Sequence, residues 1–257
     1  MATLPHERGK LEYRLYPGDP DLPDAVFLHE GLGSVAQWSR LPAVFNHRTG
    51  MRTLVYSRHG YGGSEGRGPS HDRYLHSEAL DVLPRVLSDL GISPEPLLVG
   101  HSDGASIASI YASARDVLGV VLIAPHVVFE EFTADGIRST RENFDASVLP
   151  SLTAFHDDPV ALFTAWSGVW LSAGFRQFDL TGLLPAITAP VLVIQGCEDD
   201  YGTSRQVDLV KAHVSGPTDT VLMSGVGHHP HLESLEESSQ HIYRFVHGLL
   251  GRDSHVA

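Results

Sequence analysis

The sequence predicts an α/β fold, in which a mostly parallel central β-sheet is flanked by helices and interrupted by a helical insertion. Three observations lead to this prediction. Short apolar runs alternate with helical patterns as far as Pro125, which is typical of βαβ units. The alternation stops there and resumes at Ala189. Polar or glycine-rich turns follow the apolar runs, as expected at the carboxyl ends of parallel strands, where sites form.

The strands are expected at short apolar or alternating runs, and the helices where apolar residues recur at helical spacing. The predicted strands are residues 10–16, 25–28, 52–56, 96–99, 118–124, 191–195 and 220–223. The predicted helices are residues 38–48, 71–94, the segment of small residues after Ser102, 205–213 and 232–250.

The insertion covers residues 126–184, which contain no clean buried strand and only amphipathic pieces such as residues 160–171. An insertion of this length is usually a lid or a binding element. We therefore expect one core domain, formed by residues 1–125 and 185–257, with residues 126–184 as a helical cap.

Composition limits the classes of partner. The 257 residues include 31 acidic and 18 basic side chains, which gives a net charge of −13. This argues against nucleic acid, because phosphate binding needs clustered Lys and Arg. The single cysteine, Cys197, excludes an intrachain disulfide and fits a reducing compartment. No signal-peptide pattern and no apolar run of roughly 20 residues is found. We expect a soluble cytoplasmic protein that binds a small molecule and no membrane, with monomer or homodimer left open.

The turn on which the chemistry depends is Gly-His-Ser-Asp-Gly at residues 100–104, between a predicted strand and a predicted helix. Such a turn holds a serine hydroxyl exposed at a strained backbone position. A serine is a poor nucleophile unless a base takes its proton and an acid orients that base. Two later strands end in turns that contain these groups, the acidic residues 196–200 and the histidine-rich residues 227–233.

With these turns the chain resembles the α/β-hydrolase fold superfamily over nearly its whole length, and Ser102 matches the nucleophile. The superfamily's Asp-x-x-Gly-x-Gly-x-Ser loop matches residues 57–64, except that Ser57 replaces the aspartate. The resemblance implies that residues 126–184 are the cap domain of that superfamily.

The resemblance also implies the partners of the serine. The Gly-x-x-Asp turn at residues 196–199 makes Asp199 the acid, with Asp200 as its competitor. The Gly-His-x-x-x-x-Glu pattern at residues 227–233 makes His228 the base, and His229 and His231 compete with it.

The tetrahedral intermediate of acyl transfer needs two backbone donors for its oxyanion. One is the N–H of Asp103, directly after the nucleophile. The other belongs to the turn after residues 25–28, where the superfamily usually has His-Gly-x and this chain has His29-Glu30-Gly31. By register the second donor is Gly31, with Leu32 as the alternative.

Substrate contacts are less well defined by the sequence. The carboxylate of Asp103 either bonds to neighbouring groups or favours a cationic, amine-bearing ester. Trp166 and Trp170 belong to the cap core, or one of them lines the acyl pocket. The candidates for contacting substrate are Asp103, His126, Glu30, Trp166, Trp170 and His229.

A metal site is the competing interpretation of the two late turns. His228, His229 and His231, with Glu198, Asp199 and Asp200, are possible ligands. Pro230 makes convergence of these side chains poor, and a catalytic triad already accounts for them. We therefore expect no metal and no organic cofactor.

The expected function is a serine hydrolase that cleaves a small carboxylic ester, thioester or lactone through an acyl-enzyme. A carbon–carbon bond hydrolase of the meta-cleavage-product type is an alternative. Those enzymes typically carry Asn before the serine and Trp after the histidine, where this chain has His101 and His229. An acyltransferase or perhydrolase would use the same triad, and a non-enzymatic small-molecule receptor is the remaining alternative.

Overall fold

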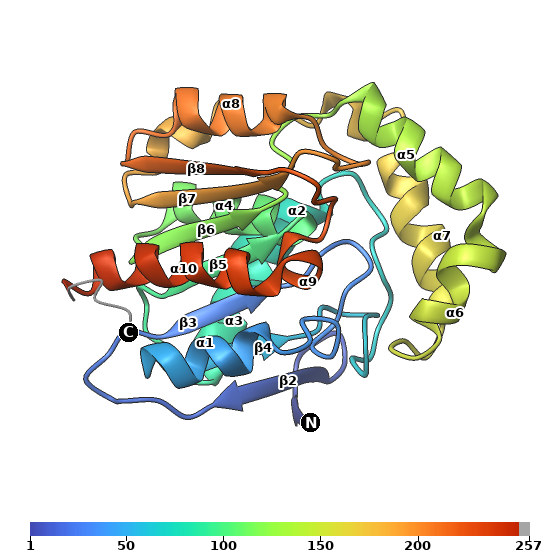
Figure 1. Ribbon diagram of the computed structural model, residues 1–257. Helices are drawn as coiled ribbons and strands as arrows, with labels where there is room; N and C mark the ends of the chain where they lie inside the picture. The colour runs from blue at the N-terminus through green and yellow to red at the C-terminus, as the bar shows by residue number, and fades with distance from the viewer. Residues whose placement is uncertain (252–257) are drawn as a thin grey trace.

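The computed structural model describes residues 1–251, which are built around one eight-stranded sheet (Figure 1). The strand order is β1-β2-β4-β3-β5-β6-β7-β8. The first two strands pair antiparallel and β2 is antiparallel to β4, whereas β3 to β8 are all parallel. The strands are β1 (Ala2–Leu4), β2 (Leu11–Tyr16), β3 (Ala25–Leu28), β4 (Thr53–Tyr56), β5 (Leu97–His101), β6 (Gly119–Ile123), β7 (Val191–Gly196) and β8 (Thr218–Met223).

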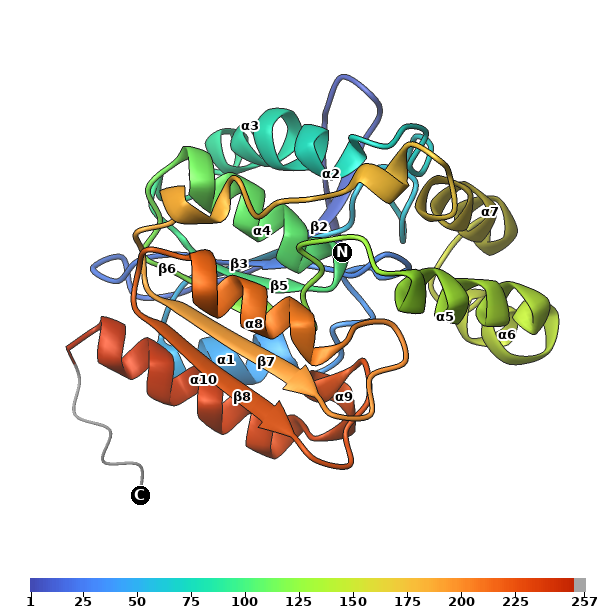
Figure 2. The same ribbon diagram turned by 90° about the horizontal axis from the view of Figure 1, so that it is seen from above.

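Helices cover both faces of the sheet, and Figure 2 shows the two sets on opposite sides. One face is covered by α2 (Tyr74–Ser77), the π-helical turn η1 (Glu78–Val82), α3 (Leu83–Asp89), α4 (Asp103–Ala114) and α8 (Ser204–His213). The other face is covered by α1 (Leu41–Thr49) and α10 (Leu235–Leu249).

This arrangement explains why the inner strands β3 to β7 are buried at every position. In β3, Val26 and Leu28 belong to the hydrophobic cluster on one face, and Ala25 and Phe27 belong to the cluster on the other. All four are buried. A strand with helices on both faces needs no polar alternation. The predicted α/β fold class with a mostly parallel sheet is therefore confirmed.

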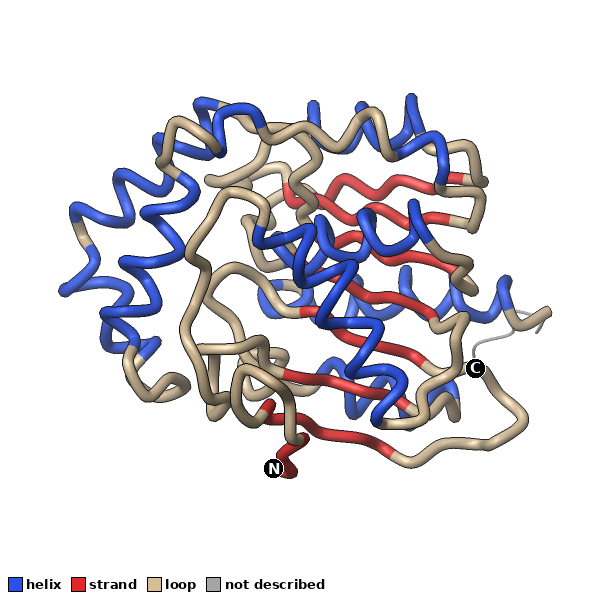
Figure 3. The backbone as a smooth tube through the Cα atoms, turned by 180° about the vertical axis from the view of Figure 1, so that it is seen from behind, coloured by secondary structure: helices blue, strands red, loops and turns tan. Residues whose placement is uncertain are grey.

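The insertion leaves the sheet after β6 and returns before β7. It consists of α5 (Glu131–Glu142), η2 (Phe144–Val148), α6 (Leu149–Leu152), α7 (Pro159–Trp170), η3 (Phe175–Gln177) and η4 (Leu184–Ala186). Figures 1 and 3 show α5, α6 and α7 beyond the loops at the carboxyl edge of the parallel strands. The outgoing and returning segments pair through Val128 and Asp179. The division into core (1–125 and 185–257) and cap (126–184) stays a prediction.

Two departures from the expected helices have local causes. The expected last helix is interrupted at Ser234, so that the short α9 (Pro230–Glu233) precedes α10. The interruption allows the Glu233 carboxylate to accept the backbone N–H groups of Gly227 and His229. The expected helix 71–94 contains the π-helical turn and ends near Leu90. No helix within residues 1–251 is long and apolar enough to cross a membrane.

Candidate active site

Ser102 occupies a strained turn between β5 and α4. Its φ of 52° and ψ of −114° are rarely adopted by a residue with a Cβ atom. The Ser102 N–H donates to the carbonyl of Ile123 at 2.9 Å, which fixes the turn on β6. A Cβ on Gly100 would overlap the Gly104 backbone, and a Cβ on Gly104 would overlap the Leu28 carbonyl. The two glycines are therefore required by close backbone contacts on either side of the serine.

His228 and the buried Asp199 form a hydrogen-bonded pair. The His228 Nδ1 lies 2.8 Å and 2.9 Å from the two carboxylate oxygens of Asp199. The same carboxylate accepts the backbone N–H groups of Tyr201 at 2.7 Å and Gly202 at 3.1 Å, and the Gln195 amide. Burial raises the pKa of Asp199, but His228 and these donors outweigh it and lower the pKa to about 2. The carboxylate is therefore ionised at neutral pH.

Two of the competing residues, Asp200 and His231, are placed elsewhere, whereas His229 lies beside His101, with the ring centroids 5.0 Å apart. Asp200 is exposed, whereas Asp199 is only 6 % exposed. His231 is buried against Trp38, with the two ring centroids 4.9 Å apart. The structure therefore brings Asp199 and not Asp200 to His228, and it places His231 in the core.

The loop that carries His228 is held from both sides. The Glu233 carboxylate accepts the N–H groups of Gly227 at 2.6 Å and His229 at 2.9 Å. The carbonyl of His228 accepts a hydrogen bond from the Nε2 of His101 at 2.8 Å. The imidazole is thus fixed relative to Ser102, because His101 is the residue directly before the serine.

A cavity of about 250 Å³ opens over these residues, and both Ser102 and His228 line it. Its remaining walls come from the loop after β3, from the insertion, and from Tyr201 and His229 in the turns after β7 and β8. Polar lining residues are Glu30, Gln37, His126, Thr133, Thr140, Ser151, Tyr201 and His229, and the others are Gly31, Leu32, Ile137, Val148, Leu152, Trp166 and Trp170. The cavity lining therefore combines apolar side chains with polar ones.

The candidate oxyanion donors lie at this cavity. Asp103 is the first residue of α4, and the first N–H groups of a helix have no partner inside it. Gly31 and Leu32 both line the cavity. The Arg58 guanidinium donates to the carbonyl of Glu30 at 2.9 Å, and that carbonyl shares a peptide with the Gly31 N–H. Because the two groups of a trans peptide point in opposite directions, the Gly31 N–H is directed away from Arg58.

The side chain of Asp103 does not reach the cavity. It is fully buried, and its Oδ2 accepts hydrogen bonds from the Tyr74 hydroxyl at 2.6 Å and from Arg58 at 3.3 Å. Tyr74 in turn accepts the indole N–H of Trp170 at 2.9 Å. Burial raises the pKa of Asp103, and Arg58 and Tyr74 oppose that rise. Of the two sequence interpretations, the geometry matches a carboxylate bonded to its neighbours and not one that faces a cationic substrate.

The other substrate candidates all line the cavity, namely Glu30, His126, Trp166, Trp170 and His229. Burial lowers the pKa of His126 to about 3. Burial, with a further contribution from His101, also lowers the pKa of His229 to about 3. Both imidazoles are therefore neutral at pH 7 and present one hydrogen-bond donor and one acceptor.

In the loop at residues 57–64, Ser57 and the Glu12 carboxylate together take the place of the superfamily's aspartate. The Ser57 hydroxyl accepts the Val35 N–H at 2.9 Å and donates to the Glu12 carboxylate at 2.7 Å. The same carboxylate accepts the Gly63 N–H at 3.0 Å. Glu12 belongs to β2, which is antiparallel to β4. The carboxylate therefore reaches the loop from the neighbouring strand.

Sequence reasoning missed Arg58 and the polar residues of the insertion. Arg58 is the second residue after an apolar strand and precedes a glycine-rich loop. A charged residue at that position was the only available signal. Of the residues considered as metal ligands, His228, His229 and His231 with the acidic residues 198–200, the described part of the chain pairs His228 with Asp199 but brings no three together. Within residues 1–251 the one group of three potential metal ligands that do lie close together is Glu30, His101 and His229.

Comparisons with known proteins agree with this architecture. A family model described as "Alpha/beta hydrolase family" matches residues 25–238. The mouse protein named "sn-1-specific diacylglycerol lipase ABHD11" is 30% identical over 176 residues, which are 68% of this chain and 55% of that protein. The "Protein phosphatase methylesterase 1" of Bos taurus is 30% identical over 144 residues, 56% of this chain and 37% of that protein. The chain thus spans less than two thirds of the length of either relative.

A solved structure described in connection with carboxylesterases of Nitrososphaera gargenis has a TM-score of 0.79 with 19% identity, and the match covers 97% of this chain and 99% of that one. At that identity the likeness concerns the fold. The family model, by contrast, covers most of the chain. The protein is therefore a member of the alpha/beta hydrolase family.

Proposed function

We propose that the protein is a serine hydrolase that cleaves a small carboxylic ester through an acyl-enzyme intermediate. The observation that carries the proposal is the hydrogen bond between Asp199 and His228, because His228 lines the same cavity as Ser102 in its strained turn. A nucleophile, a base and a group that orients the base are the minimum set for this chemistry.

The reaction proceeds in two halves. His228 accepts the proton of the Ser102 hydroxyl while the Ser102 oxygen attacks the ester carbonyl, and His228 then delivers that proton to the departing alcohol. Asp199 holds the imidazole in one tautomer and offsets its developing charge. Water next attacks the acyl-enzyme with His228 again as base, which releases the carboxylic acid and restores the serine.

The oxyanion is held by the backbone N–H groups of Asp103 and Gly31, with Leu32 as the alternative to Gly31. The hydrogen bond from Arg58 to the Glu30 carbonyl supports Gly31, because it directs the N–H of that peptide away from Arg58. One donor of this kind typically contributes about 10²–10³ in rate. Arg58 therefore acts as a positioning residue for the oxyanion hole.

The substrate class follows from the cavity and from the relatives. The walls from Ile137, Leu152 and the two tryptophans suit an apolar acyl or alcohol group. The names of the two sequence relatives refer to a lipase and a methylesterase. Small thioesters and lactones present the same carbonyl to the serine and are secondary candidates.

A fluorophosphonate label and a chromogenic short-chain ester test the proposal. The wild-type protein should be labelled at Ser102 and should turn over the ester, and Ser102→Ala should lose both. Ser113→Ala, on the same helix, is the matched control and should keep both. Labelling that persists in Ser102→Ala would reject the proposed nucleophile. Labelling of Ser102 without turnover of any ester would favour a receptor or another acyl acceptor.

A further inference from the structure

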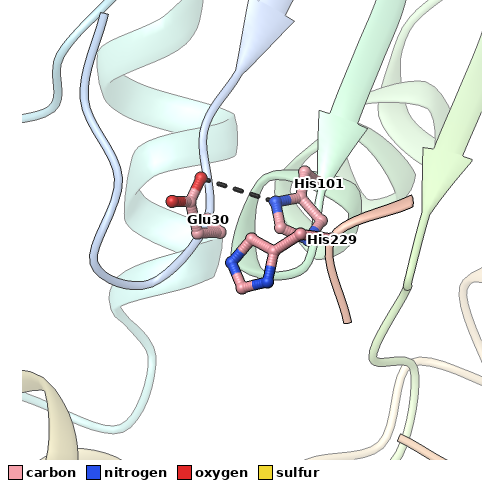
Figure 4. A group of neighbouring side chains, drawn as sticks. All are labelled: Glu30, His101 and His229. Carbon is pink, nitrogen blue, oxygen red and sulfur yellow. Dashed lines mark ion pairs between the residues drawn. The ribbon is translucent and has the colours of Figure 1, made fainter. Parts of the chain in front are cut away.

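Three side chains from three segments of the carboxyl edge of the sheet meet beside the cavity (Figure 4). Glu30 follows β3, His101 ends β5, and His229 lies between β8 and α9. One nitrogen or oxygen of each lies within 4.8 Å of the corresponding atoms of the other two. A Cβ on Gly33 would overlap the Glu30 carboxylate, so the glycine provides the space that this side chain occupies.

The hydrogen bond of His101 determines which of its nitrogens is free. His101 is fully buried, and its Nε2 lies 2.8 Å from the carbonyl oxygen of His228. A carbonyl only accepts, so Nε2 carries the proton, and in the neutral ring Nδ1 is then a bare lone pair. This Nδ1 makes no hydrogen bond and faces the Glu30 Oε2 at 3.4 Å. A positive charge between these two electron-rich atoms would turn their repulsion into an attraction.

That charge is either a proton on Nδ1 or a metal cation. A proton would involve only His101 and Glu30 and would leave the convergence of His229 unexplained. A metal ion uses all three groups and leaves a fourth position open for water, as in sites with two imidazoles and one carboxylate. Metal-binding histidines also commonly donate their second ring N–H to a backbone carbonyl, which His101 does.

We propose that Glu30, His101 and His229 form a binding site for a divalent transition-metal ion of the zinc type. The mixed nitrogen and oxygen ligands favour Zn²⁺, Co²⁺ or Ni²⁺ over Mg²⁺ and Ca²⁺, which prefer oxygen ligands. Because Glu30 and His229 line the cavity, the ion can enter from solvent.

The position of the site gives it a consequence for catalysis. Ser102 lines the same cavity, and Gly31 directly follows Glu30. A bound ion and its water would occupy space beside the serine and fix the Glu30 side chain. The ion is therefore expected to inhibit hydrolysis reversibly. Metal binding itself does not depend on the proposed function and is measured without it.

The test begins with chelator-treated protein titrated with Co²⁺, whose visible absorption reports imidazole ligation, and with Zn²⁺ by calorimetry. The wild type should bind one ion. Glu30→Gln and His229→Gln should each weaken binding at least about tenfold. The matched control is His6→Gln, because the His6 Nδ1 and the His59 Nε2 form another close imidazole pair at 2.9 Å. This variant should bind as the wild type does, and excess Mg²⁺ should not compete.

The outcomes distinguish a bound metal ion from a proton between Glu30 and His101. No Co²⁺ spectrum in the wild type would overturn the metal site and leave a proton shared by Glu30 and His101. Binding that survives in Glu30→Gln but disappears in His6→Gln would also overturn it. If ester turnover is detected, saturating Zn²⁺ should reduce it at least about tenfold, with recovery on adding chelator. A protein that binds the metal but cleaves no ester would support the site and reject the proposed function.

Discussion

The Arg58 guanidinium lies 3.3 Å from the Asp103 carboxylate, and both side chains are buried, at 3 % and 0 % exposure. The same guanidinium donates to the carbonyls of His29 and Glu30 at 2.8 Å and 2.9 Å. One side chain thus joins the two segments that supply the proposed oxyanion donors. A buried charge pair of this kind is costly to break, because removing one partner leaves the other without compensation.

Replacing Arg58 by Lys is expected to reduce kcat by about 10²–10³, the effect of losing one oxyanion donor. A single ammonium group cannot match the planar guanidinium that spans Asp103 and the two carbonyls. The KM for a short ester should change less than kcat, because the substrate cavity is not lined by Arg58. Steady-state kinetics on one chromogenic ester provide the measurement.

The control for that variant is Arg176→Lys, on an exposed arginine paired with Glu131. Its kinetics should be those of the wild type. An Arg58→Lys enzyme with unchanged kcat would show that the oxyanion donors hold their positions without this hydrogen bond.

Asp103→Asn is expected to destabilise the fold by about 3–5 kcal/mol, because it leaves the Arg58 charge buried and unpaired. It should not change the ratio of kcat/KM between a cationic and a neutral ester, because its carboxylate does not face the cavity. Urea unfolding measures the first effect and paired ester assays the second. A loss of kcat/KM on the cationic ester alone would show that the Asp103 carboxylate selects cationic substrates.

Asp199→Asn and Asp200→Asn form a matched pair of neighbouring substitutions. The first removes the partner of His228 and should lower kcat by about 10⁴, since an amide favours the wrong tautomer of the imidazole. The second changes an exposed side chain and should leave kcat within twofold, as is usual for such surface positions. Equal losses in both variants would mean that the acidic turn and not one carboxylate is required.

The low pKa of Asp199 also predicts a pH dependence of stability. Its pKa is about 2 in the folded protein and 3.8 ordinarily, so the ionised form stabilises the fold above pH 4. That contribution, about 2 kcal/mol, is lost as the pH falls from about 4 towards 2. The free energy of unfolding of wild type and Asp199→Asn, measured in urea at pH 5 and pH 3, should therefore converge at the lower pH. A constant difference would indicate that Asp199 keeps an ordinary pKa.

The sequence is sufficient to place Ser102, Asp199 and His228 at one edge of the sheet. Ser102 directly follows β5, and Asp199 and His228 lie in the turns after β7 and β8. Parallel strands end on the same side of a sheet. The choice between Asp199 and Asp200 required the structure, because only the backbone N–H groups of Tyr201 and Gly202 show which carboxylate turns inward.

The surroundings of Asp103 lay beyond sequence reasoning for a different reason. Its partners Tyr74 and Arg58 are 29 and 45 residues away along the chain. Whether its carboxylate faces substrate or protein depends on these distant contacts. The cap raised the same difficulty, since the amphipathic pattern of the insertion does not tell which side faces the cavity.

The hydrogen bond between Ser57 and Glu12 couples the amino-acid substitutions that the two positions can accept. The carboxylate that supports the glycine-rich loop comes from β2 and acts through a serine. Ser57→Asp alone would place two carboxylates against each other, and Glu12→Gln alone would leave the loop with no carboxylate. The two positions are therefore expected to exchange only together, and a double variant Ser57→Asp, Glu12→Gln should recover stability that each single variant loses.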